Sequence, residues 1–482
     1  MYLSASGASL TSRVAEAPQE CEWQRVSGGA GEPTRVQLAC SLRTAAGATD
    51  LLAGLSTSQV DLRSFENITK LHDLGLSGNQ LSEVPEAIKT LRFLTSLDLG
   101  INRITKVTTT QFEGLDDLYG LRLVGNKIEK ISKDTFSALP SLQILNLASN
   151  NIDQIDDGAF ASNMQLKAIG LDGNKLVDLK GIFTNTQPLV WLNVSNNELL
   201  WFDYSHIPTN LEWLDMHENK IEKLEDTYGV KETCNVKMLD VSNNKIRNID
   251  EFSFPSSIET IVLNHNQIEK INPGTFLQKY NLNKVILYSN KIKTLDVGAF
   301  AISSVPEDKD LPEFYIKLGN HVFIGKKRLQ VLYLNHSDIH TIQNRTFNGI
   351  ESLRVLHLEN NNLEVLRNTQ FTRLQNLNEL YLQDNKIRVI ENDTFNYLPS
   401  LEFLNLDNNG YVDYMPWRVI TDNNPRTRIS IEGNNWVCDC KDVAQLNQWL
   451  IKKSKDTENM MCYFAHGQYL CLFTPMIWKA KV

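Results

Sequence analysis

Cysteine is the residue type in this chain whose spacing points most clearly to a chemistry. Six of the seven cysteines lie near the two ends of the chain: Cys21, Cys40, Cys438, Cys440, Cys462 and Cys471. A zinc site needs CxxC-type pairs with histidines at ligand spacing, and the CxC at 438–440 fits that pattern poorly. Cysteines clustered at chain ends are typical of disulfides in secreted proteins. We therefore expect disulfides at both ends and no metal.

The pairing of these cysteines is open from the sequence, because four cysteines allow three connectivities. At the C-terminal end we expect Cys438–Cys462 together with Cys440–Cys471. The remaining cysteine, Cys234, has two interpretations. It packs as a small apolar residue, which is common for a thiol, or it forms a disulfide with a second chain.

Five Asn-x-Ser/Thr sequons are candidate glycosylation sites: Asn67, Asn193, Asn335, Asn344 and Asn392. Together with the cysteines they favour the secretory route and an extracellular or cell-surface location. Residues 1–20 nevertheless lack the basic start and apolar run of a signal peptide. The apolar stretch near the C-terminus is too short to span a bilayer, so we expect no membrane span in this chain.

Catalytic motifs are missing from the sequence. We find no GxSxG, HExxH, Walker or GxGxxG pattern, and the nine histidines are scattered. We therefore expect that the protein is not an enzyme and that it has no catalytic residue and no cofactor. The net charge of −9, without a long run of Lys or Arg, argues against nucleic acid as a partner.

The element that must position these residues is a repeat, L-x-x-L-x-L-x-x-N-x-L. It is clear from Leu71 onward, with asparagines at Asn79, Asn102 and Asn126, and it continues to Asn434. The spacing of 22 to 25 residues is that of leucine-rich repeats. Alternation in x-L-x-L-x predicts a short strand with leucines inward, and phenylalanines such as Phe112 and Phe136 are expected to fill the opposite side.

The pattern predicts an α/β repeat solenoid: a curved leucine-rich repeat horseshoe with a parallel β-sheet on its concave face and disulfide caps at both ends. The asparagine follows each strand, where its amide can satisfy backbone groups of the turn. Across 301–328 the spacing of the repeat position doubles, from Asn290 to Ser337, so we expect one degenerate unit there. The expected organisation is 1–20 disordered, 21–60 N-terminal cap, 61–300 first repeat block, 301–328 irregular connector, 329–434 second block, and 435–482 C-terminal cap and tail, with a helix near 443–453.

Outward strand positions form a column along the sheet, and part of that column is less polar than the rest. We predict a ligand-binding surface at Val262, Ile286, Tyr333, His357 and Tyr381. Clusters of exposed aromatic and aliphatic side chains often mark interaction sites. The alternative is that these are ordinary exposed apolar residues, which soluble proteins carry in number.

Several non-consensus stretches resemble the long arthropod Toll-type receptors with two leucine-rich blocks. They are WFDY at 201–204, IP at 207–208, NLEWLD at 210–215, LPEFY at 311–315, FIGKK at 323–327 and LRVLHLE at 353–359. The resemblance implies a shortened receptor ectodomain in innate immunity or development. Its partner would be a protein ligand similar to a cystine-knot cytokine, or a partner receptor in a homo- or heterodimer. The chain would lack its own signalling domain. The alternatives are a cell-adhesion or guidance protein, or a soluble decoy or fragment.

Overall fold

The computed structural model describes most of the repeat region. The described residues are 21–26, 35–40, 60, 65, 70–226, 229, 233–296, 299–300, 329–412 (except 345 and 392), 427–437 (except 432), 459–465 and 468–474. The chain divides into two compact units, Met1–Asn197 and Glu198–Val482. Among the described residues, no helix has the length and hydropathy that crossing a membrane requires.

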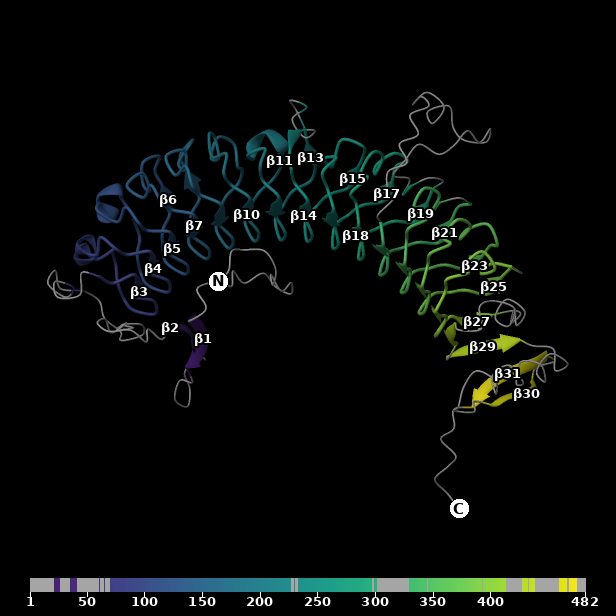
Figure 1. The fold of residues 1–482 in the computed structure, drawn as a ribbon. Helices are drawn as coiled ribbons and strands as arrows, with labels where there is room; N and C mark the ends of the chain where they lie inside the picture. Colours follow the sequence, from purple (N-terminus) through teal and green to yellow (C-terminus); the bar gives the residue numbers. More distant parts are fainter. Residues whose placement is uncertain are drawn as a thin grey trace, which may run out of the picture. The chain divides into compact units, whose positions relative to one another are not determined.

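In the first unit, three-residue strands pair in parallel in the order of the chain (Figure 1). Each is followed by a return segment of turns, 3₁₀-helix or a two-residue strand. The sheet strands are β3 (Asp73–Gly75), β4 (Ser96–Asp98), β5 (Gly120–Arg122), β7 (Ile144–Asn146), β9 (Ala168–Gly170) and β10 (Trp191–Asn193). The return segments contain η1 (Glu86–Thr90), η2 (Thr109–Phe112), β6 (Lys130–Ile131) and β8 (Gln154–Ile155).

The second unit repeats the same arrangement with more strands. Its parallel sheet contains β12 (Trp213–Asp215), β14 (Met238–Asp240), β16 (Thr260–Val262), β18 (Lys284–Ile286), β20 (Val331–Tyr333), β22 (Val355–His357), β24 (Glu379–Tyr381), β26 (Phe403–Asn405) and β28 (Arg428–Ser430). The return segments contain β11 (Phe202–Asp203), η3 (Tyr204–His206), β13 (Leu224–Glu225), β15 (Asn248–Ile249), β17 (Lys270–Ile271), β19 (Thr294–Leu295), β21 (Thr341–Ile342), β23 (Val365–Leu366) and β25 (Val389–Ile390).

The core follows from the alternation of side chains in the strands. The middle residue of every sheet strand except β28 is buried, as for Leu97 and Leu356, while its two neighbours face outward in most strands. On the other side of the core, buried phenylalanines stack from repeat to repeat. Phe276 and Phe300 have ring centroids 5.8 Å apart, and Phe112 and Phe136 are 6.1 Å apart. This confirms the predicted leucine and phenylalanine layers of a parallel leucine-rich solenoid.

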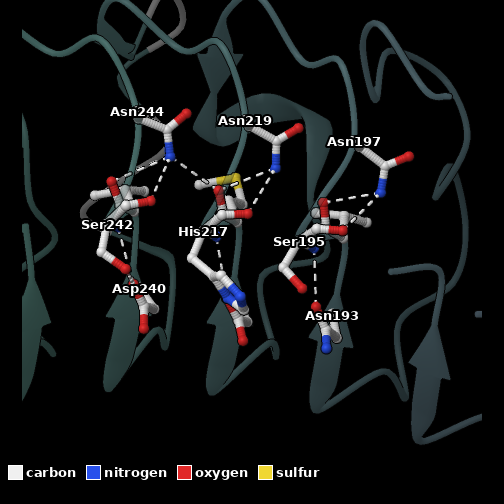
Figure 2. A network of polar contacts seen from close by, with 12 residues as sticks. Asn193, Ser195, Asn197, His217, Asn219, Asp240, Ser242 and Asn244 are labelled. Atoms are coloured by element: carbon white, nitrogen blue, oxygen red, sulfur yellow. Dashed lines mark hydrogen bonds and ion pairs between the residues drawn. The ribbon is translucent and has the colours of Figure 1, made fainter. Parts of the chain in front are cut away.

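The asparagines that follow the sheet strands form a ladder of buried hydrogen bonds, with Ser337 in the equivalent position after β20. Figure 2 shows Asn244, whose side-chain amide donates to the carbonyls of Met216 (3.0 Å), Val241 (3.1 Å) and Ser242 (3.1 Å). Its side-chain oxygen accepts from the Ile221 amide at 2.9 Å. Each asparagine therefore bonds within its own turn and to the preceding one, as the repeat predicted. We call these positions the asparagine ladder.

The residue before each ladder position has a left-handed backbone. Its φ is positive in every repeat of both units, and most repeats place Gly, Asn, Asp, Ser or His there. Ile101 is the residue least suited to a positive φ among these positions; its φ is 52° and its side chain is 60% exposed. A β-branched side chain in this region is strained. The turn conformation is thus imposed by the stack, even where the residue does not favour it.

The degenerate repeat that we predicted within 301–328 is not present in the sheet. Strand β18 pairs directly with β20, with Ile286 opposite Tyr333, and β19 pairs directly with β21. The rings of Phe300 and Phe347 stack at 6.0 Å. The doubled spacing therefore reflects an insertion into one repeat, not an additional turn. Residues 301–328 themselves lie outside the described residues.

Short strands at the two ends contain four of the terminal cysteines. Antiparallel β1 (Cys21–Val26) and β2 (Arg35–Cys40) place Cys21 opposite Cys40 in register. At the other end, β27 (Gly410–Val412), β29 (Asn434–Val437), β30 (Asn459–Ala465) and β31 (Gln468–Thr474) form a sheet. In it, Cys462 lies opposite Cys471 in register. Residues 438–458, with Cys438, Cys440 and the predicted helix, lie outside the described residues, so the disulfides stay a prediction.

Candidate functional site

The five predicted ligand-binding residues lie in one column of strand positions in the second unit's sheet, in which Val262 is buried at 9% exposure and the other four are half-buried. Register pairs Val262 with Ile286, Ile286 with Tyr333, Tyr333 with His357, and His357 with Tyr381. Consecutive strands thus carry them side by side across the insertion. That these residues bind a ligand stays a prediction, but the structure brings all five together.

Four aromatic rings in this region lie in a continuous row, which we call the aromatic ladder: Tyr333, His357, Tyr381 and Phe403. The Tyr333 and His357 centroids are 4.4 Å apart at 10°, and His357 and Tyr381 are 4.3 Å apart at 3°. The Phe403 centroid lies 5.3 Å from that of Tyr381, with its ring tilted by 58°. All four side chains are half-buried. Such contacts contribute about 0.5–1.5 kcal/mol per pair beyond burial, so the rings are held in place before any partner arrives.

Charged groups surround the ladder. The Lys284 ammonium lies 5.5 Å from the centre of the Tyr333 ring, and the Arg428 guanidinium lies 5.4 Å from that of Phe403. Between these ends, the Tyr381 hydroxyl donates to Glu379 at 2.7 Å. Burial, with the hydrogen bond and charge of Glu379, raises the pKa of Tyr381 to about 12. The hydroxyl therefore stays protonated and acts as a donor.

A second polar cluster lies on β12 and β14 of the same unit. Asp215 and Asp240 are register partners, and His217 Nδ1 lies 2.7 Å from Asp215 Oδ1. His217 and Asp240 are labelled in Figure 2. The hydrogen bond to Asp215 raises the pKa of His217, and burial raises the pKa of Asp240. The Ser242 amide and hydroxyl donate to Asp240 at 2.9 and 2.6 Å.

This cluster has the composition of a metal site, because the possible ligand atoms of its three residues lie within 4.8 Å of one another. One oxygen of each carboxylate already takes part in hydrogen bonds, Asp215 Oδ1 with His217 and Asp240 Oδ1 with Ser242. We therefore assign no metal to it.

The sequons differ in exposure. Asn344 is exposed and Asn335 is half-buried. Asn193 is 4% exposed, and its side-chain oxygen accepts from the Ser195 amide at 2.9 Å (Figure 2). Asn67 and Asn392 lie outside the described residues. A glycan at Asn193 has almost no space in the folded protein, which argues against that site.

Cys234, for which the sequence allowed packing or pairing between chains, is 4% exposed. Burial of this side chain favours the packing interpretation, because a disulfide to a second chain needs an accessible sulfur atom.

Comparison with known proteins identifies the family to which the repeats belong. The family model for the leucine rich repeat matches residues 92–152, 116–176, 140–199, 209–268, 234–283, 316–363 and 351–410, which together are more than half of the chain. The chain belongs to the leucine-rich repeat family. Over 237 residues this leucine-rich repeat protein is 46% identical to Toll-like receptor 7 of Drosophila melanogaster. The match covers 49% of the chain and 16% of that receptor.

Two solved structures share the leucine-rich repeat fold. The Toll–Spatzle complex from Drosophila gives a TM-score of 0.60 at 16% identity, covering 79% of this chain and 53% of the other. The LRIM1/APL1C complex gives 0.57 at 20% identity, covering 83% and 64%. At these identities the likeness shows the fold alone. The chain thus spans only part of the length of each of these relatives.

Proposed function

We propose that this chain is an extracellular, ligand-binding part of a Toll-type receptor, and that it binds a protein through the outward strand face of its second unit. The partner is a secreted ligand similar to a cystine-knot cytokine, or another leucine-rich receptor. Similarity to Toll-like receptor 7 over half of the chain supports the receptor class. The Toll–Spatzle and LRIM1/APL1C structures are complexes built on the same fold.

The observation that carries the proposal is the aromatic ladder. Tyrosine and arginine are enriched where protein interfaces bind most strongly. Tyr333 and Tyr381 are fixed by stacking on His357, and a polar group lies beside each ring. The surface can bury apolar area and still satisfy hydrogen bonds, which suits binding rather than catalysis.

The test uses the chain secreted with a supplied signal peptide and immobilised on a sensor surface. Purified cystine-knot cytokines and leucine-rich receptor ectodomains are passed over it as probes. We expect saturable binding of at least one probe, and a roughly thirtyfold or greater loss of affinity in the Tyr333→Ala, Tyr381→Ala double variant.

The matched control is Tyr397→Ala. Tyr397 is 53% exposed and lies outside the sheet strands, so its loss should leave affinity unchanged. Binding that survives the double variant, or that is lost equally in the control, would contradict the assignment of the ladder.

A further inference from the structure

The two ends of the aromatic ladder already bind cations of this chain. Lys284 lies over the outer ring, Tyr333, and Arg428 lies over the other outer ring, Phe403. Aromatic faces attract cations, and guanidinium and ammonium groups are the ones found in proteins. The structure therefore contains two examples of the contact that these rings favour.

The middle of the ladder is electronegative. His357 Nδ1 contacts the Glu359 carboxylate at 3.0 and 3.2 Å, and Tyr381 donates to Glu379. Among the ion pairs within the described residues, Glu359 pairs with His357, and no lysine or arginine pairs with Glu359 or Glu379. Two carboxylates thus lie beside two ring edges between the two cationic ends.

The same carboxylates act on the tyrosine. Burial has the largest effect on the pKa of Tyr381, and the charges of Glu379 and Glu359 raise it further. A negative potential at the middle of the ladder is the physical cause of that contribution, because negative charge disfavours the phenolate. Asp384 and Asp407, on the turns that follow β24 and β26, add carboxylates at the same edge of the sheet.

We propose that the middle of the ladder, around His357 and Tyr381, receives an arginine- or lysine-bearing apolar segment of the protein partner. This inference rests on the proposed function and specifies the chemistry of the partner. The partner's cation lies beside the half-buried Glu379, its neighbouring apolar side chains cover the rings, and Glu359, which is 8% exposed, adds its negative charge there. Opposite charge on the two sides would also speed association.

The probe is a fluorescein-labelled twelve-residue peptide of alternating arginine and leucine, with a second peptide in which glutamate replaces arginine. Both are titrated against the full chain at low and at high salt. We expect the arginine peptide to bind at least roughly tenfold more tightly than the glutamate peptide, with affinity that falls as salt rises. The Glu359→Gln, Glu379→Gln double variant should weaken it by roughly fivefold or more.

The control variant is Glu198→Gln, which removes one surface carboxylate that pairs with Lys220 away from the ladder. It should leave peptide affinity unchanged. Because glutamine can still accept from Tyr381, we expect the circular dichroism of the Glu359→Gln, Glu379→Gln variant to be unaltered. The Tyr333→Ala, Tyr381→Ala variant tests the contribution of the rings separately.

The results of these titrations distinguish the proposed binding face from the proposed cationic partner. Binding that is lost with the tyrosines but unchanged with the glutamines would keep the ladder as the binding face and overturn the cationic partner. Equal binding of both peptides would assign the ladder to an uncharged apolar segment, and preference for the glutamate peptide would assign it to an acidic one. Either result overturns the inference.

Discussion

Replacing one member of the asparagine ladder should destabilise the first unit by about 2–5 kcal/mol. Asn150 is 7% exposed, and its side-chain oxygen accepts from the Ile128 amide at 3.1 Å. Its amide donates to the carbonyls of Leu123 (3.0 Å), Leu147 (3.0 Å) and Ala148 (3.2 Å). The change Asn150→Ala removes all four hydrogen bonds.

Losing the four hydrogen bonds does not cost the same free energy for each, because the three carbonyls each keep a second donor. Leu123 also accepts from Asn126, Leu147 from Asn174, and Ala148 from the Gly125 amide. The Ile128 amide donates to the Asn150 side chain, so it is the group left without its acceptor. An unsatisfied buried amide costs about 1–3 kcal/mol, and losing three shared bonds adds roughly 1–2 kcal/mol.

The assay is urea unfolding followed by circular dichroism, with hydrogen exchange of the Ile128 amide as a local report. The matched control is Asn151→Ala at the next residue, whose side chain makes no hydrogen bond with the described part of the chain. The control should change the free energy of unfolding by less than about 0.5 kcal/mol. A loss below about 1 kcal/mol for Asn150→Ala, or equal losses for both variants, would refute the reasoning.

Three further predictions concern single sites. Ile101→Asn should raise the free energy of unfolding by about 1 kcal/mol, since asparagine tolerates the left-handed backbone, and an unchanged urea midpoint would contradict this. The raised pKa of His217 gives stability that is present below its unfolded pKa of 6.5 and is lost as pH rises through the folded value. Asp215→Asn should lower the His217 pKa in an NMR titration and shrink the stability difference between about pH 5 and pH 8; an unmoved titration would exclude Asp215 as the cause. Glycan mapping of the secreted chain should find Asn344 occupied and Asn193 unoccupied; a glycan at Asn193 would show that its burial is not maintained.

The regular part of the fold was predictable because each repeat contains the residues that determine its own conformation. The alternating leucines and the asparagine determine which side chains are buried, and both layers lie where the pattern predicts. The insertion was misjudged for a related reason. Spacing alone cannot distinguish an extra turn from a loop when the intervening residues do not keep the pattern, and the pairing of Ile286 with Tyr333 decides between them.

The site was predictable in part. One column of outward residues was identified, because register places equivalent positions side by side. Phe403 was missed, since it lies in the neighbouring column, opposite Glu379, and its ring reaches Tyr381 diagonally. The contact between His217 and Asp215 was missed as well, because it depends on side-chain rotamers, which a repeat pattern does not encode.

The direct pairing of β18 with β20 has a practical consequence for protein engineering. Strand register and ring stacking continue between the repeats on either side of residues 301–328 as they do between any two repeats. The entropic cost of connecting two fixed ends grows only slowly with the number of residues between them. We therefore expect that an affinity tag inserted within 301–328, in the middle of the chain, leaves the pairing of β18 with β20 intact.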